Sequence, residues 1–165
     1  MVEEWKKMMA RNLDRELEAR GFSNSERARS AYHHYRNLIF GWIKSMAEEI
    51  QNSSRNPRSV LIVEDEDTLT VNIGTEMIRV KARPYPLCSR GWGKITVKST
   101  NKLLFNEMYL WSKGDNFIWV YGDAQPNDIE KGESDRLQPG IEVTRETVEV
   151  LFQSAFKKYL GNQLN

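Results

Sequence analysis

The spacing of apolar residues predicts two helices at the start of the chain. From residue 2 to residue 20, apolar side chains recur every three or four positions, which is the period of a helix with one apolar face. Gly21 is expected to end this helix, because glycine readily adopts the left-handed conformation found after helix C-termini. Ser23 and Glu26 then form a capping-box pattern, and a second, longer helix is predicted from about 24 to 51.

After a polar linker at 51–58, the apolar period changes from about 3.6 residues to about two. The alternating stretches read SVLIVE, DTLTVNI, MIRVKAR, KITVKS, EMYLWS and NFIWVYG. They predict an antiparallel sheet of about six strands joined by short connections. The last two stretches are apolar at both odd and even positions, so both of their faces are expected to be covered.

The chain closes with an acidic stretch and a third helix. Residues 123–143 hold six acidic and two basic residues, and we expect a mobile acidic loop there. A helix is predicted from about 144 to 160, with Thr144 as its N-cap. The pattern therefore predicts one α+β domain over 1–165, with two N-terminal helices, an antiparallel sheet of about six strands and one C-terminal helix packed on the sheet. Whether this sheet is flat or curved around a cavity stays open.

Composition narrows the class of protein. The chain has 165 residues, of which 39% are hydrophobic, enough for one domain with a substantial core. Its single cysteine cannot form an internal disulfide, and its charged N-terminus lacks the apolar segment of a signal peptide. The longest apolar run, LIFGWI, has six residues, whereas a membrane span needs about 20. We therefore expect a cytoplasmic protein that does not enter a membrane.

Charge is distributed unevenly along the chain. The net charge is only +1, yet residues 77–106 hold seven basic residues and no acidic one. The alternation of the strands places several of these bases on one polar face, beside an arginine and a tryptophan in the connecting segment; the candidate nucleic-acid-binding residues are Arg79, Lys81, Arg83, Arg90, Trp92, Lys94 and Lys98. Cations beside aromatic rings are typical of nucleic-acid surfaces. The alternative interpretation is that the cations are ordinary solvated strand positions and that Trp92 belongs to the core.

No pattern in the sequence indicates catalysis. His33 and His34 are adjacent on the predicted long helix, so they lie about 100° apart and cannot bind one metal ion together. No nucleophile and base stand in a recognisable catalytic motif. We therefore expect neither a metal nor another cofactor, and an enzymatic function is not favoured.

Three functions stay open. The leading hypothesis is a non-enzymatic binding module whose partner is a protein, most simply a second copy of this chain, because the aromatic positions exceed what three helices should cover. The candidate interface residues are Phe40, Tyr109, Trp111, Trp119 and Tyr121. The first alternative is nucleic-acid binding through residues 77–106. The second is a small-ligand-binding or enzymatic cavity between a curved sheet and the C-terminal helix.

Overall fold

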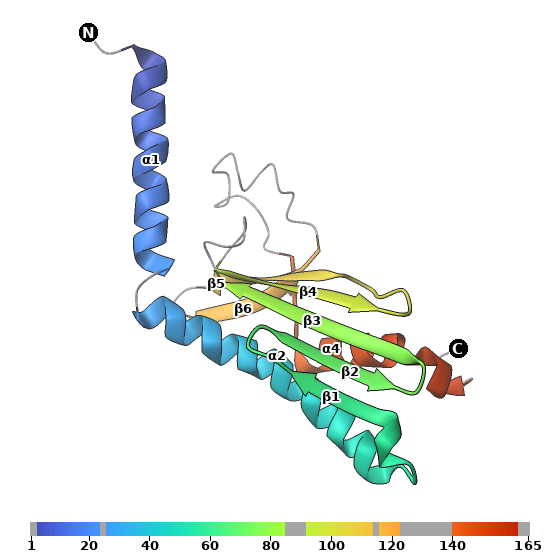
Figure 1. Cartoon of the computed structure of the whole chain (residues 1–165). Coiled ribbons are helices and arrows are strands. Elements are labelled where there is room, and N and C mark those ends of the chain that lie inside the picture. Colours follow the sequence, from blue (N-terminus) through green and yellow to red (C-terminus); the bar gives the residue numbers. More distant parts are fainter. Residues whose placement is uncertain (1–2, 24–25, 85–91, 114–115, 123–139, 162–165) are drawn as a thin grey trace.

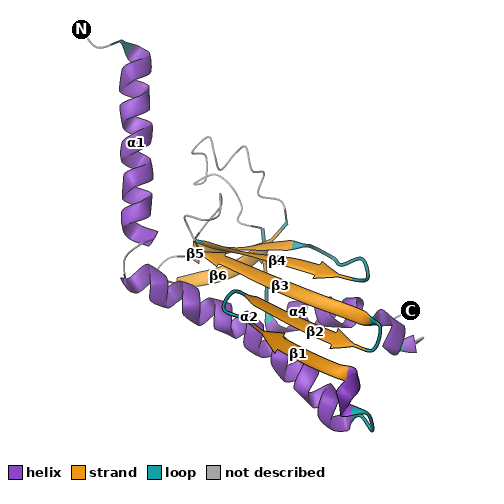
Figure 2. Cartoon of the chain, viewed as in Figure 1, coloured by secondary structure: helices purple, strands orange, loops and turns teal. Residues whose placement is uncertain are grey.

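The protein consists of helices at both ends and an antiparallel sheet between them (Figures 1 and 2). The computed structural model describes residues 3–23, 26–84, 92–113, 116–122 and 140–161, without the side chains of 16–28 and 112–113. Helices α1 (Glu4–Ser23) and α2 (Glu26–Ser53) precede the sheet, and helix α4 (Arg145–Ala155) follows it. The predicted α+β class and the order of its elements are therefore confirmed.

The sheet is a meander in which each strand pairs with the strand before it. Its seven antiparallel strands are β1 (Val60–Glu64), β2 (Thr68–Ile73), β3 (Glu76–Pro84), β4 (Gly93–Ser99), β5 (Glu107–Lys113), β6 (Asn116–Tyr121) and β7 (Ile141–Glu142). The seventh strand lies inside the stretch that was predicted to be a mobile acidic loop, and it pairs with β6. The first part of that stretch, residues 123–139, lies outside the described residues.

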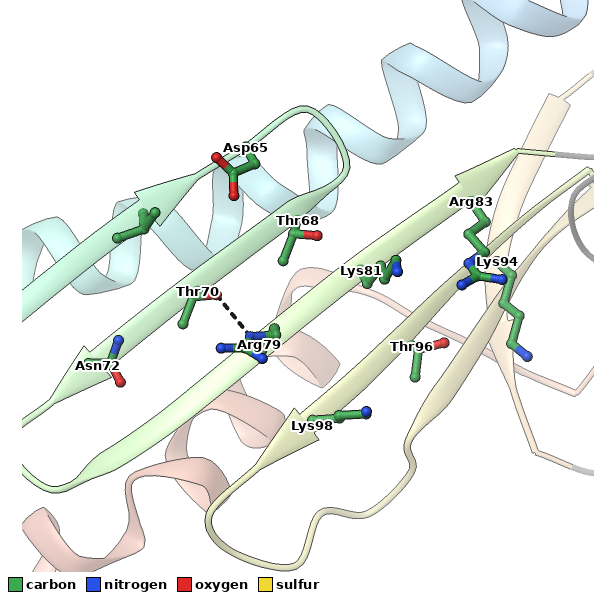
Figure 3. A pocket seen from close by; sticks show the side chains of 11 residues that line it. Asp65, Thr68, Thr70, Asn72, Arg79, Lys81, Arg83, Lys94, Thr96 and Lys98 are labelled. Carbon is green, nitrogen blue, oxygen red and sulfur yellow. Dashed lines mark hydrogen bonds between the residues drawn. The ribbon is translucent and has the colours of Figure 1, made fainter.

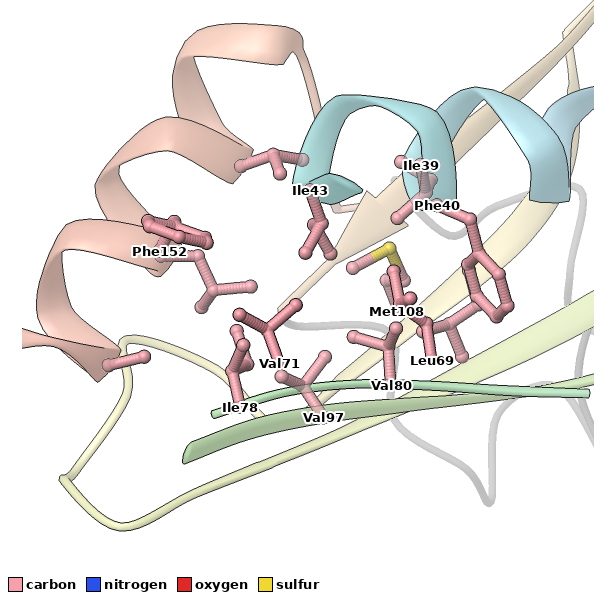
Figure 4. Close-up of a cluster of buried hydrophobic side chains, with 14 of the residues drawn as sticks. Ile39, Phe40, Ile43, Leu69, Val71, Ile78, Val80, Val97, Met108 and Phe152 are labelled. Carbon is pink, nitrogen blue, oxygen red and sulfur yellow. The ribbon is translucent and has the colours of Figure 1, made fainter. Parts of the chain in front are cut away.

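Helices α2 and α4 cover the same face of the sheet and close the core there (Figures 1 and 4). The inward positions predicted from the alternation are confirmed, since Leu69, Val71, Ile78, Val80 and Val97 are all buried. On the helix side, the buried residues of α4 are Val148, Leu151, Phe152 and Ala155. Packed apolar side chains thus lie between the sheet and the C-terminal helix. A ligand cavity in this region stays one of the predicted alternatives.

The helix boundaries differ in part from the prediction. Helix α1 continues through Gly21 to Ser23, because a glycine lowers helix stability by only about 1 kcal/mol and does not by itself end a helix. Thr144 is the N-cap of α4, as predicted; its hydroxyl accepts from the backbone N–H of Thr147 at 3.3 Å. Helix α4 ends at Ala155, and a short 3-10 turn, η3 (Lys157–Tyr159), follows it. The predicted single helix to residue 160 is therefore two elements.

Polar contacts fix the helices to the strands. Lys44 of α2 donates to the Glu64 carboxylate of β1 at 2.7 Å, and this hydrogen bond raises the pKa of Lys44. The backbone N–H of Thr75, in the turn between β2 and β3, donates to the Tyr159 phenol oxygen at 3.0 Å. Hydrogen bonding to Thr75 lowers the pKa of this phenol. These contacts attach α2 to strand β1 and the C-terminal turn η3 to the β2–β3 turn.

Gly41 gives a direct test of the α2 packing. It lies on the exposed side of the helix, and a Cβ added there would meet nothing within 4 Å. We expect Gly41→Ala to stabilise the protein by about 0.5–1 kcal/mol, because alanine loses less backbone entropy on helix formation. Urea unfolding would measure the gain. Gly93→Ala is the control that should not gain stability, because its Cβ would lie 3.0 Å from the Tyr32 ring. A Gly41→Ala protein that is less stable than wild type would contradict the exposed position of Gly41 on α2.

Candidate functional site

The face of the sheet opposite the helices carries the cationic residues (Figure 3). Ile78, Val80 and Ala82 of β3 are buried in the core, so the alternating residues of that strand point to the other face. This places Arg79, Lys81 and Arg83 on the side of β3 that faces away from α2 and α4. Lys94 and Lys98 of β4 lie beside them, and the five residues together form what we call the cationic face.

The strand register brings like charges directly opposite one another. Arg79 of β3 is the cross-strand partner of Lys98 of β4, and Arg83 is the partner of Lys94. Like charges at directly opposite positions destabilise a sheet. Folding stability alone would therefore not favour these pairs. An anion bound between the cations would reduce the repulsion within each pair.

The cationic face forms the floor of an open hollow of about 1000 Å³. Short polar side chains from β2 and β4 complete its lining, namely Thr68, Thr70, Asn72 and Thr96. The Arg79 Nε–H donates to the Thr70 hydroxyl oxygen at 3.2 Å, which holds the guanidinium over β2 (Figure 3). Hydroxyl and amide groups are the uncharged groups that most often accompany Arg and Lys at nucleic-acid phosphates.

Few carboxylates balance this charge. Asp65, in the turn between β1 and β2, is the one acidic residue among the described residues that line the hollow. Lys94 is paired, because its Nζ lies 3.1 Å from the Glu107 carboxylate and 5.8 Å from the centre of the Tyr109 ring. Within the described ranges, no carboxylate forms an ion pair with Arg79, Lys81, Arg83 or Lys98. Four exposed cations are thus open to an external anion.

Of the two remaining candidates of the nucleic-acid prediction, only Trp92 is described, and it does not line the hollow. Arg90 lies outside the described residues. Trp92 is half-buried and packs against the core, in line with the alternative interpretation that it belongs to the core. No aromatic ring is found among the described residues that line the hollow. The described part of the lining therefore offers charge and hydrogen-bonding groups without an aromatic ring.

The candidate interface residues lie mostly inside the protein. Phe40 and Trp119 belong to the core, with 1% and 2% of their surface exposed, and Tyr109 is also buried. Trp111 is half-buried, and Tyr121 is half-buried and stacked against Phe105 with 4.1 Å between ring centres. An interface through these residues stays a prediction, and their burial gives it no support.

Sequence reasoning missed two sets of residues. Thr68, Thr70 and Asn72 line the hollow, and the polar side of their alternating strand was the signal that could have identified them. Trp5, Met8, Met9 and Leu13 are exposed on α1, for which the helical period predicted an apolar face without indicating that it would be exposed. Periodicity identifies an apolar face but not the surface that covers it.

The described part of the chain shows neither a metal-binding cluster nor a membrane-spanning helix. The described side chains contain no group of three or more histidine, cysteine or acidic residues placed to bind a metal ion. None of the described helices is both long and apolar enough to cross a bilayer. Comparison of the chain with protein-family models, curated proteins and solved structures finds no match. The cationic face is therefore the candidate functional site of the described residues.

Proposed function

We propose that the protein binds nucleic acid by its phosphate backbone, on the cationic face of the sheet. The observation that carries this proposal is the register, which sets Arg79 opposite Lys98 and Arg83 opposite Lys94 on a face that none of the described helices covers. A polyanion laid across β3 and β4 would replace the repulsion within each pair by attraction to both of its members.

The spread of the cations favours a polyanion over a single small anion. Arg79, Lys81 and Arg83 follow one another at every second position of β3, about 7 Å apart along the strand. Their side chains are exposed and lie side by side across the hollow, whereas a site for one small anion needs groups that converge on one point. A ligand with repeated charges makes use of all of them.

The lining also indicates which part of the nucleic acid is recognised. Cations, hydroxyls and an amide suit phosphate and sugar oxygens, which position a nucleic acid but carry no sequence information. Exposed aromatic rings, on which unpaired bases stack, are missing from the described lining. We therefore expect binding that depends strongly on salt and weakly on base sequence.

The test is a salt titration of binding to a fluorescent DNA duplex. If about four cations contact phosphates, log K should fall with log salt at a slope of about −3 to −4. Arg79→Ala with Lys81→Ala should reduce the magnitude of the slope by about two, with the fold intact because both side chains are exposed. Fluorescence anisotropy gives the affinities, and circular dichroism monitors the fold.

The matched control removes the same charge elsewhere. Arg55 and Arg58 are exposed and do not line the hollow, so Arg55→Ala with Arg58→Ala should leave the slope unchanged. Equal losses in both double variants would assign the binding to net charge and contradict the proposal. The absence of measurable binding to duplex or single-stranded nucleic acid at low salt would remove it altogether.

A further inference from the structure

Helix α1 carries an apolar stripe that the described part of the molecule leaves uncovered. Figure 1 shows α1 projecting from the start of α2, away from the sheet. Trp5, Met9 and Leu13 follow one another at four-residue spacing, and 56%, 64% and 54% of their surfaces are exposed. At 3.6 residues per turn they lie on one side of the helix, together with the exposed Met8. A stripe of this kind indicates a docking surface.

An apolar groove lies elsewhere on the molecule, between the end of α2 and the C-terminal elements. Its volume is about 540 Å³. Its apolar lining comes from α2, from the end of β2 and from the segment that includes α4 and η3, and consists of Met46, Ile50, Ile73, Phe152, Phe156 and Leu160. Ile50 is 38% exposed in this groove, so part of its side chain is accessible to a partner. The groove and the stripe on α1 have the same apolar chemistry.

The charges beside the two surfaces are complementary. On α1, the helical period places Lys6 and Arg15 on the two borders of the stripe and the helix position of Glu16 within it, which leaves a net positive charge there. Glu3 and Asp14 fall on the opposite side of the helix, together with Lys7 and Arg11. The Lys6 Nζ lies 5.2 Å from the centre of the Trp5 ring, in agreement with this placement. The groove is bordered by Glu49 of α2 and Glu149 of α4. Neither glutamate makes an ion pair with a described residue, so both are open to the bases of α1.

The helix of the same chain is too short to fill the groove. From Ser23, the last residue of α1, back to Trp5 is about 27 Å at 1.5 Å per residue. From Glu26, the first residue of α2, to Ile50 is about 36 Å on the same scale. If α1 folded back along α2, Trp5 would end about 9 Å before Ile50, and Met9 and Leu13 would end earlier still. The α1 of a second copy has no such limit.

From these observations we infer that α1 of one copy docks its apolar stripe in the α2–α4 groove of a second copy, whose own α1 docks in return. The exchange closes as a two-fold symmetric dimer in which each chain gives one helix and receives one. Lys6 and Arg15 face Glu49 and Glu149 at the rim of each contact. This inference uses neither the cationic face nor its ligand, so it stands or falls separately from the proposed function.

The test is sedimentation equilibrium of the full chain and of two glutamate variants, Met9→Glu on the helix and Ile50→Glu in the groove. The wild type should be a dimer. Each variant alone should dimerise about 30-fold more weakly or worse, because it places an unpaired carboxylate in an apolar contact. The neighbouring controls Ala10→Glu and Val150→Glu, which lie off the stripe and outside the groove, should leave the dimer unchanged.

Mixing the two variants identifies the occupant of the groove. The Ile50→Glu chain has an intact α1 and the Met9→Glu chain has an intact groove, so an equal mixture should regain one contact and form a mixed dimer. If α1 paired with another α1, the mixture would regain nothing and Ile50→Glu alone would stay dimeric; either result overturns the inference. A wild type that is monomeric at high micromolar concentration also overturns it. Circular dichroism of each variant separates loss of dimer from loss of fold.

Discussion

Phe40→Ala should destabilise the protein by about 3–5 kcal/mol. The side chain is 1% exposed and lies between α2 and the sheet, near Leu69 and Val80 (Figure 4). Its removal takes a whole ring from the core and leaves a cavity that the surrounding strands cannot fill without moving. The guanidinium of Arg36, 4.6 Å from the centre of the ring, would also lose its aromatic neighbour. Chemical unfolding by guanidinium chloride measures the loss.

This variant also decides between two roles for Phe40. If Phe40 belonged to a protein interface, as the sequence pattern suggested, its loss would weaken association and leave the unfolding free energy of the monomer almost unchanged. Leu38→Ala is the control on the same helix, and it should cost far less because Leu38 is 37% exposed. Where Phe40→Ala does not fold at all, Phe40→Leu gives a smaller loss of the same sign. A Phe40→Ala protein as stable as wild type would contradict the core position.

Replacing four cations of the open face by threonine should abolish salt-dependent binding and at the same time stabilise the fold. The variant carries Arg79→Thr, Lys81→Thr, Arg83→Thr and Lys98→Thr, and thus extends the pattern that Thr68 and Thr70 already set on β2. With four phosphate contacts, the wild type should lose about 100-fold in affinity between about 50 and 200 mM salt. The variant should bind weakly, with little dependence on salt over that range.

The gain in stability follows from the register. Arg79 and Lys98 lose their mutual repulsion, while Arg83 is removed from opposite Lys94, whose charge is already balanced by Glu107. We therefore expect a higher free energy of unfolding, mainly from the Arg79–Lys98 pair. Urea unfolding of both proteins without ligand measures this change. A control with Arg55, Arg58, Arg145 and Lys157 changed to glutamine removes equal charge from exposed positions outside the hollow. A threonine variant that keeps wild-type affinity and salt slope would refute the role of the face.

Much of the fold can be predicted from the sequence, because residues that face the core must be apolar and recur with the period of the helix or strand. Leu69, Val71 and Ile73 alternate with polar residues, and all three are buried as their spacing predicts. Strand β7 escaped prediction because two residues in an acidic stretch have no readable period. Its pairing with β6 is decided by hydrogen bonds of the backbone, which any side chain allows.

The candidate site was predictable in composition but not in arrangement. Alternation alone put Arg79, Lys81 and Arg83 on one face. That Arg79 lies opposite Lys98 depends on the register of β3 with β4. That register depends in turn on the connection between the strands and on the fit of the whole core, neither of which a single strand encodes. The same limit applies to Phe40, which looked like an outer residue until the packing of α2 on the sheet placed it inside.

The order of the meander has a consequence for how the chain is made. Strands that pair with their predecessors form contacts of short range along the sequence, so the sheet can form while the ribosome is still adding residues. The apolar face of β1 to β6 is complete at Tyr121, but α4, which shares in covering it, is complete only at Ala155. At about 5–20 residues per second, the interval lasts about 2–7 s. During that time the apolar face of the sheet, with Ile78 and Val97, lacks the cover of α4, and chaperones that recognise apolar strands could bind the nascent chain.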